Sequence, residues 1–292
     1  MILAAIDIGS NAARMLITEA KEYKDGTTDY IKLNLLRVPL RLGFDVFENG
    51  FISNERKHQL IETMKVYKLL QGIYKVEKMR ACATSAMRDA SNGKEIIEEV
   101  YKQTGIQINI ISGQEEANII YETHVAENLN LNKSYLYIDV GGGSTEVTLF
   151  SRNQIVFKES FNIGTIRLLQ KNVTDEQWDY MKTHIKNNLR DHPNVEAIGS
   201  GGNINKIFSL SKRKEGKALP LELLKDYYKE LGATSLEDRK HRYGFRDDRA
   251  DVIVPALQIF ISLMRWAGAE EINVPKIGLA DGIVRMLYAA TK

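Results

Sequence analysis

Three glycine-rich turns in this chain combine the residue types that best hold an anion. They are DIGSN (Asp7–Asn11), DVGGGSTE (Asp139–Glu146) and GSGGN (Gly199–Asn203). Glycine has no Cβ, so the backbone of such a turn can adopt positive φ and let a ligand approach closely. Successive N–H groups then form a concave anion site, and a helix expected to begin near Asn203 would add its N-terminus. The turns therefore predict phosphate binding.

Two carboxylates flank the second turn. Asp139 precedes the three glycines and Glu146 follows them, so both would repel a phosphate placed directly between them. A divalent cation between the carboxylates and the phosphate oxygens resolves the conflict, and Mg²⁺ favours such ligands. A Walker A loop is excluded, because no Gly-Lys-Ser/Thr ending is present and the next segment has a strand pattern. A plain hairpin turn would need one or two glycines, without flanking acids.

Two further segments carry charged candidates at expected helix starts. In ATSAMRDASNG (Ala83–Gly93), Arg88 would lie in the first turn or two of a helix, where its guanidinium could grip a phosphate. The alternative is an ordinary exposed arginine. In IISGQEEANIIYE (Ile110–Glu122), a strand is expected to end at Ile111 and a helix to begin with Glu115 and Glu116. These acids either complement the helix dipole or supply a general base for an attacking water.

The elements that must position these residues form an α/β pattern. Apolar and β-branched runs alternate with helical patterns, and hairpin-like pairs predict a mixed sheet. Strands are expected near Leu3–Ile6, Met15–Thr18, Ile31–Val38, Met79–Ala83, Ile106–Ile111, Tyr135–Val140, Glu146–Phe150, Ile155–Ser160 and Val195–Ile198.

A weak internal repeat divides the chain. AAIDIGSNAARMLI (Ala4–Ile17) and LYIDVGGGSTEVTLF (Leu136–Phe150) have one plan, in which Asp7 matches Asp139 and Gly9 matches Gly141. Two copies of one supersecondary unit predict two similar domains that face one another.

Bulk properties narrow the class of protein. A length of 292 residues suits two domains, and 40 basic against 38 acidic residues give a net charge of +2, which does not indicate a general nucleic-acid binder. The single cysteine, Cys82, predicts a reducing, cytoplasmic setting. The N-terminal residues do not have the pattern of a signal peptide. The apolar run Val252–Met264 is too short to span a bilayer, so a buried helix is expected and no membrane partner.

Six motifs together resemble one family. DIGSNAARML, ATSAMRDASNG, ISGQEEANIIY, IDVGGGSTEV, NIGTIRL and GSGGNI occur in the order found in the exopolyphosphatase/guanosine pentaphosphate phosphohydrolase family, and RADVIVPALQIF is also similar. The resemblance covers essentially the whole chain. It implies the actin-like ATPase, sugar kinase and Hsp70 fold group, with two ribonuclease-H-like α/β domains and an active-site cleft between them. The expected domains are residues 1–124 and 125–278, with a last helix (279–292) that packs back on the first domain.

The resemblance also implies roles for particular residues. Glu116 corresponds to the family's proposed catalytic base and Arg88 to its phosphate-contacting arginine. Asp7, Asp139 and Glu146 correspond to acids around the metal and the reactive phosphate, so Mg²⁺ or another divalent cation is expected. The glycine loops would orient the phosphates through Gly9, Ser10, Asn11, Gly141, Gly142, Gly143, Ser144, Gly201, Gly202 and Asn203.

Some positions depart from the family pattern. Ala12 stands where a serine is usual, and Leu279–Gly282 replaces a motif that often carries an arginine. The chain resembles the short, two-domain form. Short members often pair as dimers, and the apolar C-terminal helices would serve a core or a homodimer interface equally.

The expected activity is metal-assisted hydrolysis of the terminal phosphoanhydride of inorganic polyphosphate. A polyphosphate chain would also need a basic track, for which there are two clusters; solvated surface charge is the alternative for each lysine. The alternatives for the whole protein are guanosine pentaphosphate hydrolysis, an ATPase or sugar kinase of the same fold, and a non-catalytic phosphate or alarmone sensor. The clusters are Lys206, Lys212, Arg213, Lys214 and Lys217, and Arg239, Lys240, Arg242, Arg246 and Arg249.

Overall fold

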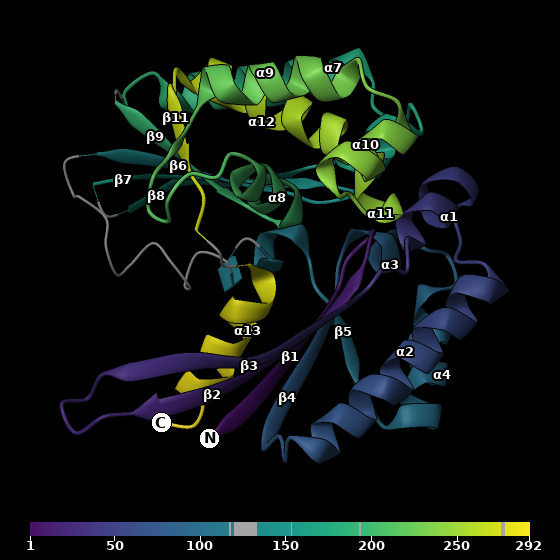
Figure 1. Ribbon diagram of the computed structural model, residues 1–292. Coiled ribbons are helices and arrows are strands. Elements are labelled where there is room, and N and C mark those ends of the chain that lie inside the picture. Colours follow the sequence, from purple (N-terminus) through teal and green to yellow (C-terminus); the bar gives the residue numbers. More distant parts are fainter. Residues whose placement is uncertain (117, 120–132, 153, 193, 276–277) are drawn as a thin grey trace. The chain divides into compact units, whose positions relative to one another are not determined.

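The chain forms two compact α/β units in a computed structural model (Figure 1). The structure describes residues 1–116, 118–119, 133–152, 154–192, 194–275 and 278–292. One unit comprises Met1–Thr123 together with Gly278–Lys292, and the other comprises His124–Ile277. The chain therefore leaves the first unit, builds the second, and returns to the first.

The first unit contains a five-stranded mixed sheet of order β3-β2-β1-β4-β5. The antiparallel pairs β1–β2 and β2–β3 and the parallel pairs β1–β4 and β4–β5 confirm the mixed sheet that the sequence predicts. Its strands are β1 (Ile2–Ile8), β2 (Ala13–Glu22), β3 (Thr28–Val38), β4 (Lys78–Ala83) and β5 (Ile108–Ile110).

Alternation along β1 separates the two faces of this sheet. Ala4, Ile6 and Ile8 join a buried cluster that includes residues of the long helices α2 and α4. The buried helix α13 packs against β1, β2 and β4, and Figure 1 shows it on the opposite face of the sheet from α2 and α4. Tyr288 of α13 donates a hydrogen bond to Glu22 of β2 over 2.9 Å. The helices are α1 (Leu42–Asn49), α2 (Asn54–Ile73), α3 (Ser85–Asp89), α4 (Gly93–Thr104) and α13 (Leu279–Ala289).

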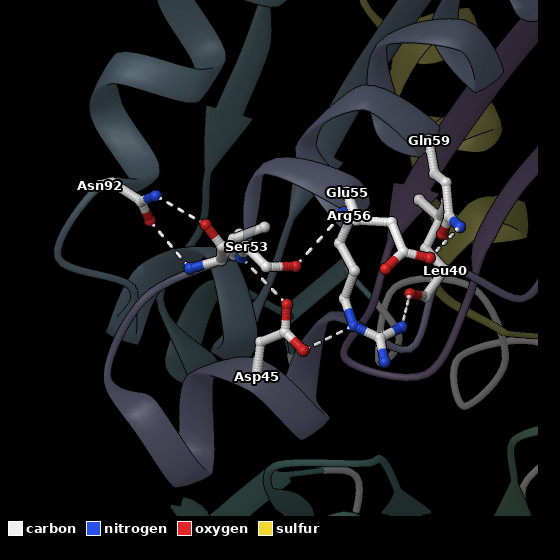
Figure 2. Close-up of polar contacts among 8 residues, drawn as sticks. Leu40, Asp45, Ser53, Glu55, Arg56, Gln59 and Asn92 are labelled. Carbon is white, nitrogen blue, oxygen red and sulfur yellow. Dashed lines mark hydrogen bonds and ion pairs between the residues drawn. The ribbon is translucent and has the colours of Figure 1, made fainter.

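Short-range polar contacts fix the junction between α1 and α2 (Figure 2). Ser53 caps α2, and its backbone N–H donates to Asp45 over 2.9 Å. Arg56 donates to Asp45 over 2.6 Å and to the carbonyl of Leu40 over 2.7 Å. Burial alone would raise the pKa of Asp45, but the hydrogen bonds from Ser53 and Arg56 together hold that pKa below its ordinary value. The junction therefore holds the start of α1 in place.

The second unit contains a six-stranded sheet of order β10-β11-β9-β6-β7-β8. The strands are β6 (Ser134–Val140), β7 (Thr145–Ser151), β8 (Gln154–Phe161), β9 (Val195–Ser200), β10 (Leu219–Pro220) and β11 (Glu271–Asn273). The nine strands expected from the sequence are all found, whereas β10 and β11 were missed. Their two and three residues are too few to show a period.

The helices of this unit surround one core that is centred on α12. A capping box formed by Thr174 and Gln177 begins α7. The segment Asp247–Ala267 is long and apolar enough by composition to cross a membrane, but 56% of its most apolar window is buried. Its side chains pack in the core of the unit, which confirms the expected buried helix. The helices are α6 (Thr165–Leu169), α7 (Asp175–Leu189), α8 (Gly202–Leu210), α9 (Leu221–Gly232), α10 (Leu236–Tyr243), α11 (Asp247–Ala250) and α12 (Ile253–Ala267).

The two units repeat one plan. In each, an antiparallel three-stranded meander is followed by a helix, and the first strand of the meander then pairs in parallel with a later strand. The registers agree as well: Asp7 lies opposite Arg14 in the first hairpin, and Asp139 lies opposite Glu146 in the second. The internal repeat seen in the sequence is therefore a structural repeat.

Candidate active site in two glycine-loop units

In the first unit, Asp7 lies near the carboxyl end of β1 and is 6% exposed. Arg14 on the neighbouring strand donates to its carboxylate over 3.2 Å. Burial raises the pKa of Asp7, and the charge and hydrogen bond of Arg14 offset part of that rise. Asp7 therefore has a counter-ion within its own hairpin.

Hydrogen bonds within the turn and from the start of α1 fix the turn after Asp7. Gly9 N–H donates to the carbonyl of Ala12 over 3.0 Å and so closes the turn. Gly43 and Arg41, at the start of α1, donate to the carbonyls of Ser10 and Asn11. The hydroxyl groups of Ser10 and Ser85 lie 2.8 Å apart, which links this turn to the start of α3. Because Gly9 N–H is engaged within the turn, an anion here would be held mainly by the groups that follow it.

Arg88 follows β4 of the same sheet, and the two glutamates follow the neighbouring strand β5. Arg88 is in the last turn of the five-residue helix α3, half-buried, and donates to the carbonyl of Ile111 over 3.0 Å. It is not the exposed arginine of the alternative interpretation. The helix after β5 begins at residue 113, two residues earlier than expected, because Ser112 accepts a hydrogen bond from Glu115 N–H. Arg88 thus braces the segment that carries Glu115 and Glu116.

The two glutamates differ in their surroundings. Glu115 forms an ion pair with Arg80 over 2.8 Å, whereas Oε2 of Glu116 is buried. Both lie close enough to Cys82 for their charges to act on its thiol. The pKa of Cys82 is raised to about 11, mainly by burial; Arg80 lowers it in part, and the charges of Asp7 and the two glutamates contribute to the rise. The thiol is therefore protonated at neutral pH, as the expected role of a small buried side chain requires.

In the second unit, Glu146 is 2% exposed and lies opposite Asp139 across the hairpin. Its Oε1 accepts hydrogen bonds from Ser144 over 2.7 Å and from Ser160 over 2.8 Å. This position corresponds to Arg14 of the first unit, so the second hairpin has a carboxylate where the first has a cation. Two facing carboxylates beside a glycine loop are a donor set that fits a divalent cation.

The triple-glycine loop is anchored by the start of α6. Thr165 and Ile166 donate backbone hydrogen bonds to the carbonyls of Gly141 and Gly142, over 3.0 and 2.8 Å. The side chain of Arg167 donates to the carbonyl of Gly143 over 2.8 Å. Gly141 N–H closes the turn by donating to Ser144. The loop carbonyls therefore point toward α6, and an anion would bind on the opposite side of the loop.

Glycine is required in this region for close approach. A Cβ on Gly164 would lie 2.4 Å from the carbonyl oxygen of Gly142. The expected positive φ is not found at Gly141; it is found at Gly201, with φ 96°. There the backbone passes the carboxylate of Asp139, and a Cβ on Gly201 would be 2.9 Å from its Oδ1. The third turn therefore lies directly against Asp139.

The third turn leads into α8, which begins at Gly202. The guanidinium of Arg249 lies against Gly202, where a Cβ would be 2.7 Å from its nitrogen, and it donates to the side chain of Asn203. Ser200 is fully buried beside Asp139 in the strand register. Sequence reasoning placed Arg249 only in a basic cluster. The motif RADVIVPALQIF was the available indication that this arginine belongs with the glycine turns.

Other members of that basic cluster have structural partners. Arg239 donates to the carbonyls of Leu231 and Ala250, and Lys240 forms ion pairs with Glu237 and Asp247. Arg242 forms an ion pair with Asp238. Lys206 of the other cluster lies 5.4 Å from the ring centroid of Phe245. The second cluster therefore supports local folding more than it forms a continuous basic track.

The predicted site residues thus form two sets. Asp7, Ser10, Arg88 and Glu116 belong to the first unit; Asp139, Gly141–Ser144, Glu146 and Gly201–Asn203 belong to the second. Within the described part of the chain, no three His, Cys, Asp or Glu side chains gather at one point as a metal site. The pair that fits a divalent cation is Asp139 and Glu146, while Asp7 is already paired with Arg14.

Two α/β units that each have an Asp-X-Gly turn at the end of the first strand define a class of proteins with a duplicated α/β hairpin unit. The family model described as "Ppx/GppA phosphatase family" matches residues 32–289. The chain belongs to this family.

Curated relatives and a solved structure agree with this membership. The chain is 31% identical over 228 residues to a bifunctional 3-dehydroquinate synthase/phosphatase of Fusobacterium nucleatum, covering 73% of this chain and 34% of that protein. It is 30% identical to a guanosine-5'-triphosphate,3'-diphosphate pyrophosphatase of Pseudoalteromonas translucida, over 99% of this chain and 59% of the relative. It is 23% identical to exopolyphosphatase 1 of Mycobacterium bovis, over 97% and 87%. The chain therefore spans only part of the first two relatives.

The Ppx/GppA family member of Aquifex aeolicus has a solved structure with 27% sequence identity and a TM-score of 0.77. The match covers 100% of this chain and 99% of that one. This likeness over the full length confirms the two-unit α/β fold that the sequence predicts.

Proposed function

We propose that this protein hydrolyses the terminal phosphoanhydride of inorganic polyphosphate, with Glu116 as general base. The observation that carries the proposal is the second hairpin, where Asp139 and Glu146 face each other beside a glycine loop whose carbonyls are tied back by α6. Such a site can hold a phosphate and a divalent cation together. Membership of the phosphatase family, and the likeness to a relative named exopolyphosphatase 1, support this substrate class.

Separate groups of residues would bind the phosphates, stabilise the transferred phosphoryl group and hold the cation. The glycine loops and the N-terminus of α8 would bind and orient the phosphates. Arg88 and Arg249 would stabilise charge on the transferred phosphoryl group. Asp139 and Glu146 would hold Mg²⁺ or another divalent cation, which supplies charge neutralisation at phosphate oxygens.

Glu116 would act on the attacking water. Glu115 is paired with Arg80, whereas Oε2 of Glu116 is buried beside it. Glu116 would take the proton as the water oxygen bonds to the terminal phosphorus and the bond to the bridging oxygen breaks. The two products are inorganic phosphate and a chain shortened by one phosphate. The cytoplasm is the proposed setting for this step.

The second candidate is hydrolysis of guanosine pentaphosphate at the same site. It is favoured by 30% identity over 99% of the chain to a relative named for that substrate. A third candidate is a sensor that binds such anions without turnover. The buried Ala12, which replaces a usual hydroxyl side chain, favours this alternative.

Phosphate release from long-chain polyphosphate and from guanosine pentaphosphate, each with Mg²⁺, tests the proposal. Glu116→Gln should lower turnover by about 10²–10⁴-fold and leave substrate binding in place, because a general base contributes about that much. The neighbouring Glu115→Gln, which loses the ion pair with Arg80, is the matched control and should retain most activity.

Each result separates the candidates. Release from polyphosphate that is lost in Glu116→Gln supports the proposal, whereas near-normal turnover in that variant removes Glu116 from the role. Release from the nucleotide alone favours the second candidate. Tight binding of both substrates without release favours the sensor.

A further inference from the structure

The second unit contains a hollow at the end of its sheet opposite to the glycine loops. It has a volume of about 1200 Å³ and lies beside Lys133, Val195 and Glu196, where β6 and β9 begin. Asp139 is six residues further along β6, which is roughly 20 Å at about 3.3 Å per residue. This distal hollow is therefore separate from the candidate active site within the unit.

Four exposed cations line the distal hollow, and no ion pair joins any of them to another residue within the described ranges. Lys186 lies in the last turn of α7, and Arg190 follows that helix. Lys217 lies in the loop before β10, and Arg265 lies near the end of α12. They come from three segments of the sequence, because Lys186 and Arg190 share the end of α7, and they line one space. By contrast, the nearby Lys133 is already paired with Glu196.

Helix ends account for only part of this charge. A cation in the last turn offsets the partial negative charge of a helix C-terminus, and this explains Lys186 and Arg265. It does not explain Lys217, which lies in a loop. Glu270 and Glu271 also line the distal hollow, so four cations minus two carboxylates leave an excess of two positive charges. The excess favours an anion with several charges over one with a single charge.

The wall of the distal hollow includes the half-buried Trp266, whose ring centroid is 5.9 Å from that of Trp178. Guanidinium groups bind phosphate oxygens in pairs, and an aromatic ring offers a surface on which a base can stack. We propose that the distal hollow is a second anion-binding site, which takes a triphosphate chain. This site goes beyond the proposed hydrolysis, and its existence does not require turnover.

Intrinsic fluorescence gives a direct readout, because Trp178 and Trp266 are the only two tryptophans in the chain. The full-length protein is titrated with inorganic tripolyphosphate while a chelator removes divalent cations. Calorimetry in parallel detects binding that the fluorescence misses. We expect saturable binding that weakens as the ionic strength rises to about 1 M, where the Debye length is only about 3 Å.

Matched variants separate this site from the candidate active site. Lys186→Gln/Lys217→Gln should weaken tripolyphosphate binding by roughly fivefold or more, because two charge contacts are removed. Lys171→Gln/Lys229→Gln removes two exposed lysines that do not line the distal hollow, and should leave the affinity unchanged. Arg190→Gln/Arg265→Gln provides a second, independent pair of changes in the distal hollow.

GTP is titrated in a second arm, since a triphosphate chain can belong to an inorganic anion or to a nucleotide. Tighter binding of GTP than of tripolyphosphate would show that the base contributes, and equal affinity would show that the phosphate chain alone is recognised. Equal affinities in the hollow variants and the control variant would overturn the proposal, as would no fluorescence change together with no heat. Loss of phosphate release in an activity assay bears on the proposed function alone.

Discussion

At the scale of single residues, the informative comparison is between equivalent positions of the two hairpins. Asp7 faces Arg14, whereas Asp139 faces Glu146. The sequence predicted the three carboxylates as one metal set, but it could not predict that Asp7 has a counter-ion from its own hairpin. That pairing depends on the strand register, and a shift of one residue would turn Arg14 to the other face of the sheet. The structure thus distinguishes carboxylates that look alike in sequence.

Asp7→Asn should separate stability from activity. Because burial raises the pKa of Asp7, its contribution to stability is fully present below about pH 3.8, the ordinary value, and is lost as the pH rises through the folded-state pKa. Asparagine cannot ionise, so we expect the variant to be at least as stable as the unmodified protein at pH 7. Phosphate release should fall by at least about tenfold, because a site carboxylate is lost.

Urea unfolding at pH 7 and near pH 4 measures the first effect, and the advantage of the variant should shrink at the lower pH. Asp226→Asn removes an exposed carboxylate on α9 and should have little effect at either pH. A variant that is less stable than the unmodified protein at pH 7 would contradict the expectation.

At the scale of elements, local patterns predicted most of the strands, because the periodicity of a strand depends on neighbouring residues. Local patterns could not predict the contact between Gly164 and the triple-glycine loop, since the two segments are about 20 residues apart in sequence, with β7 and β8 between them. The placement of Arg249 against Gly202 is a similar case, because it joins α8 to the residues before α12. Long-range contacts of this kind complete the second and third turns.

Gly164→Ala should displace the loop that Asp139 and Glu146 flank. The added Cβ would lie 2.4 Å from a backbone oxygen, so the loop or α6 must shift, at a cost of about 1–3 kcal/mol of unfolding free energy. We also expect weaker substrate binding, measured as a raised KM for phosphate release. Gly232→Ala at the end of α9 is the control, because nothing lies within 4 Å of its Cβ position. Equal stability and KM in the two variants would show that the loop tolerates the shift.

At the scale of the whole molecule, the return of α13 to the first unit is the feature with the widest effect. Ile283 is fully buried, and α13 packs against β1, β2 and β4. Further contacts join α13 and the C-terminal residues to β2 and β3, including the ion pair of Lys32 with Asp281 and the edge-to-face pair of Tyr30 with Tyr288. The sequence predicted that a last helix packs on the first domain only through the family resemblance, since helical periodicity does not name a partner surface.

Ile283→Ala should therefore destabilise the first unit, by about 2–5 kcal/mol. Both tryptophans belong to the second unit, so tryptophan fluorescence follows that unit while far-ultraviolet circular dichroism follows both. In urea, the dichroism change should begin earlier than in the unmodified protein, ahead of the fluorescence change. Leu287→Ala, at a half-exposed position of the same helix, should have a smaller effect. An unchanged dichroism curve for Ile283→Ala would contradict this role of α13.

The same return of the chain sets an order of events during synthesis on the ribosome. The first unit needs Met1–Thr123 and also Gly278–Lys292, whereas the second is the continuous segment His124–Ile277. The whole second unit is synthesised before the residues of α13 leave the ribosome, so one face of the first sheet cannot be covered by α13 until the second unit has been made. Folding from the N-terminus first is the usual order in multidomain chains. During this interval one apolar face of the nascent first sheet is uncovered, and the apolar surface that a chaperone could bind is at its largest.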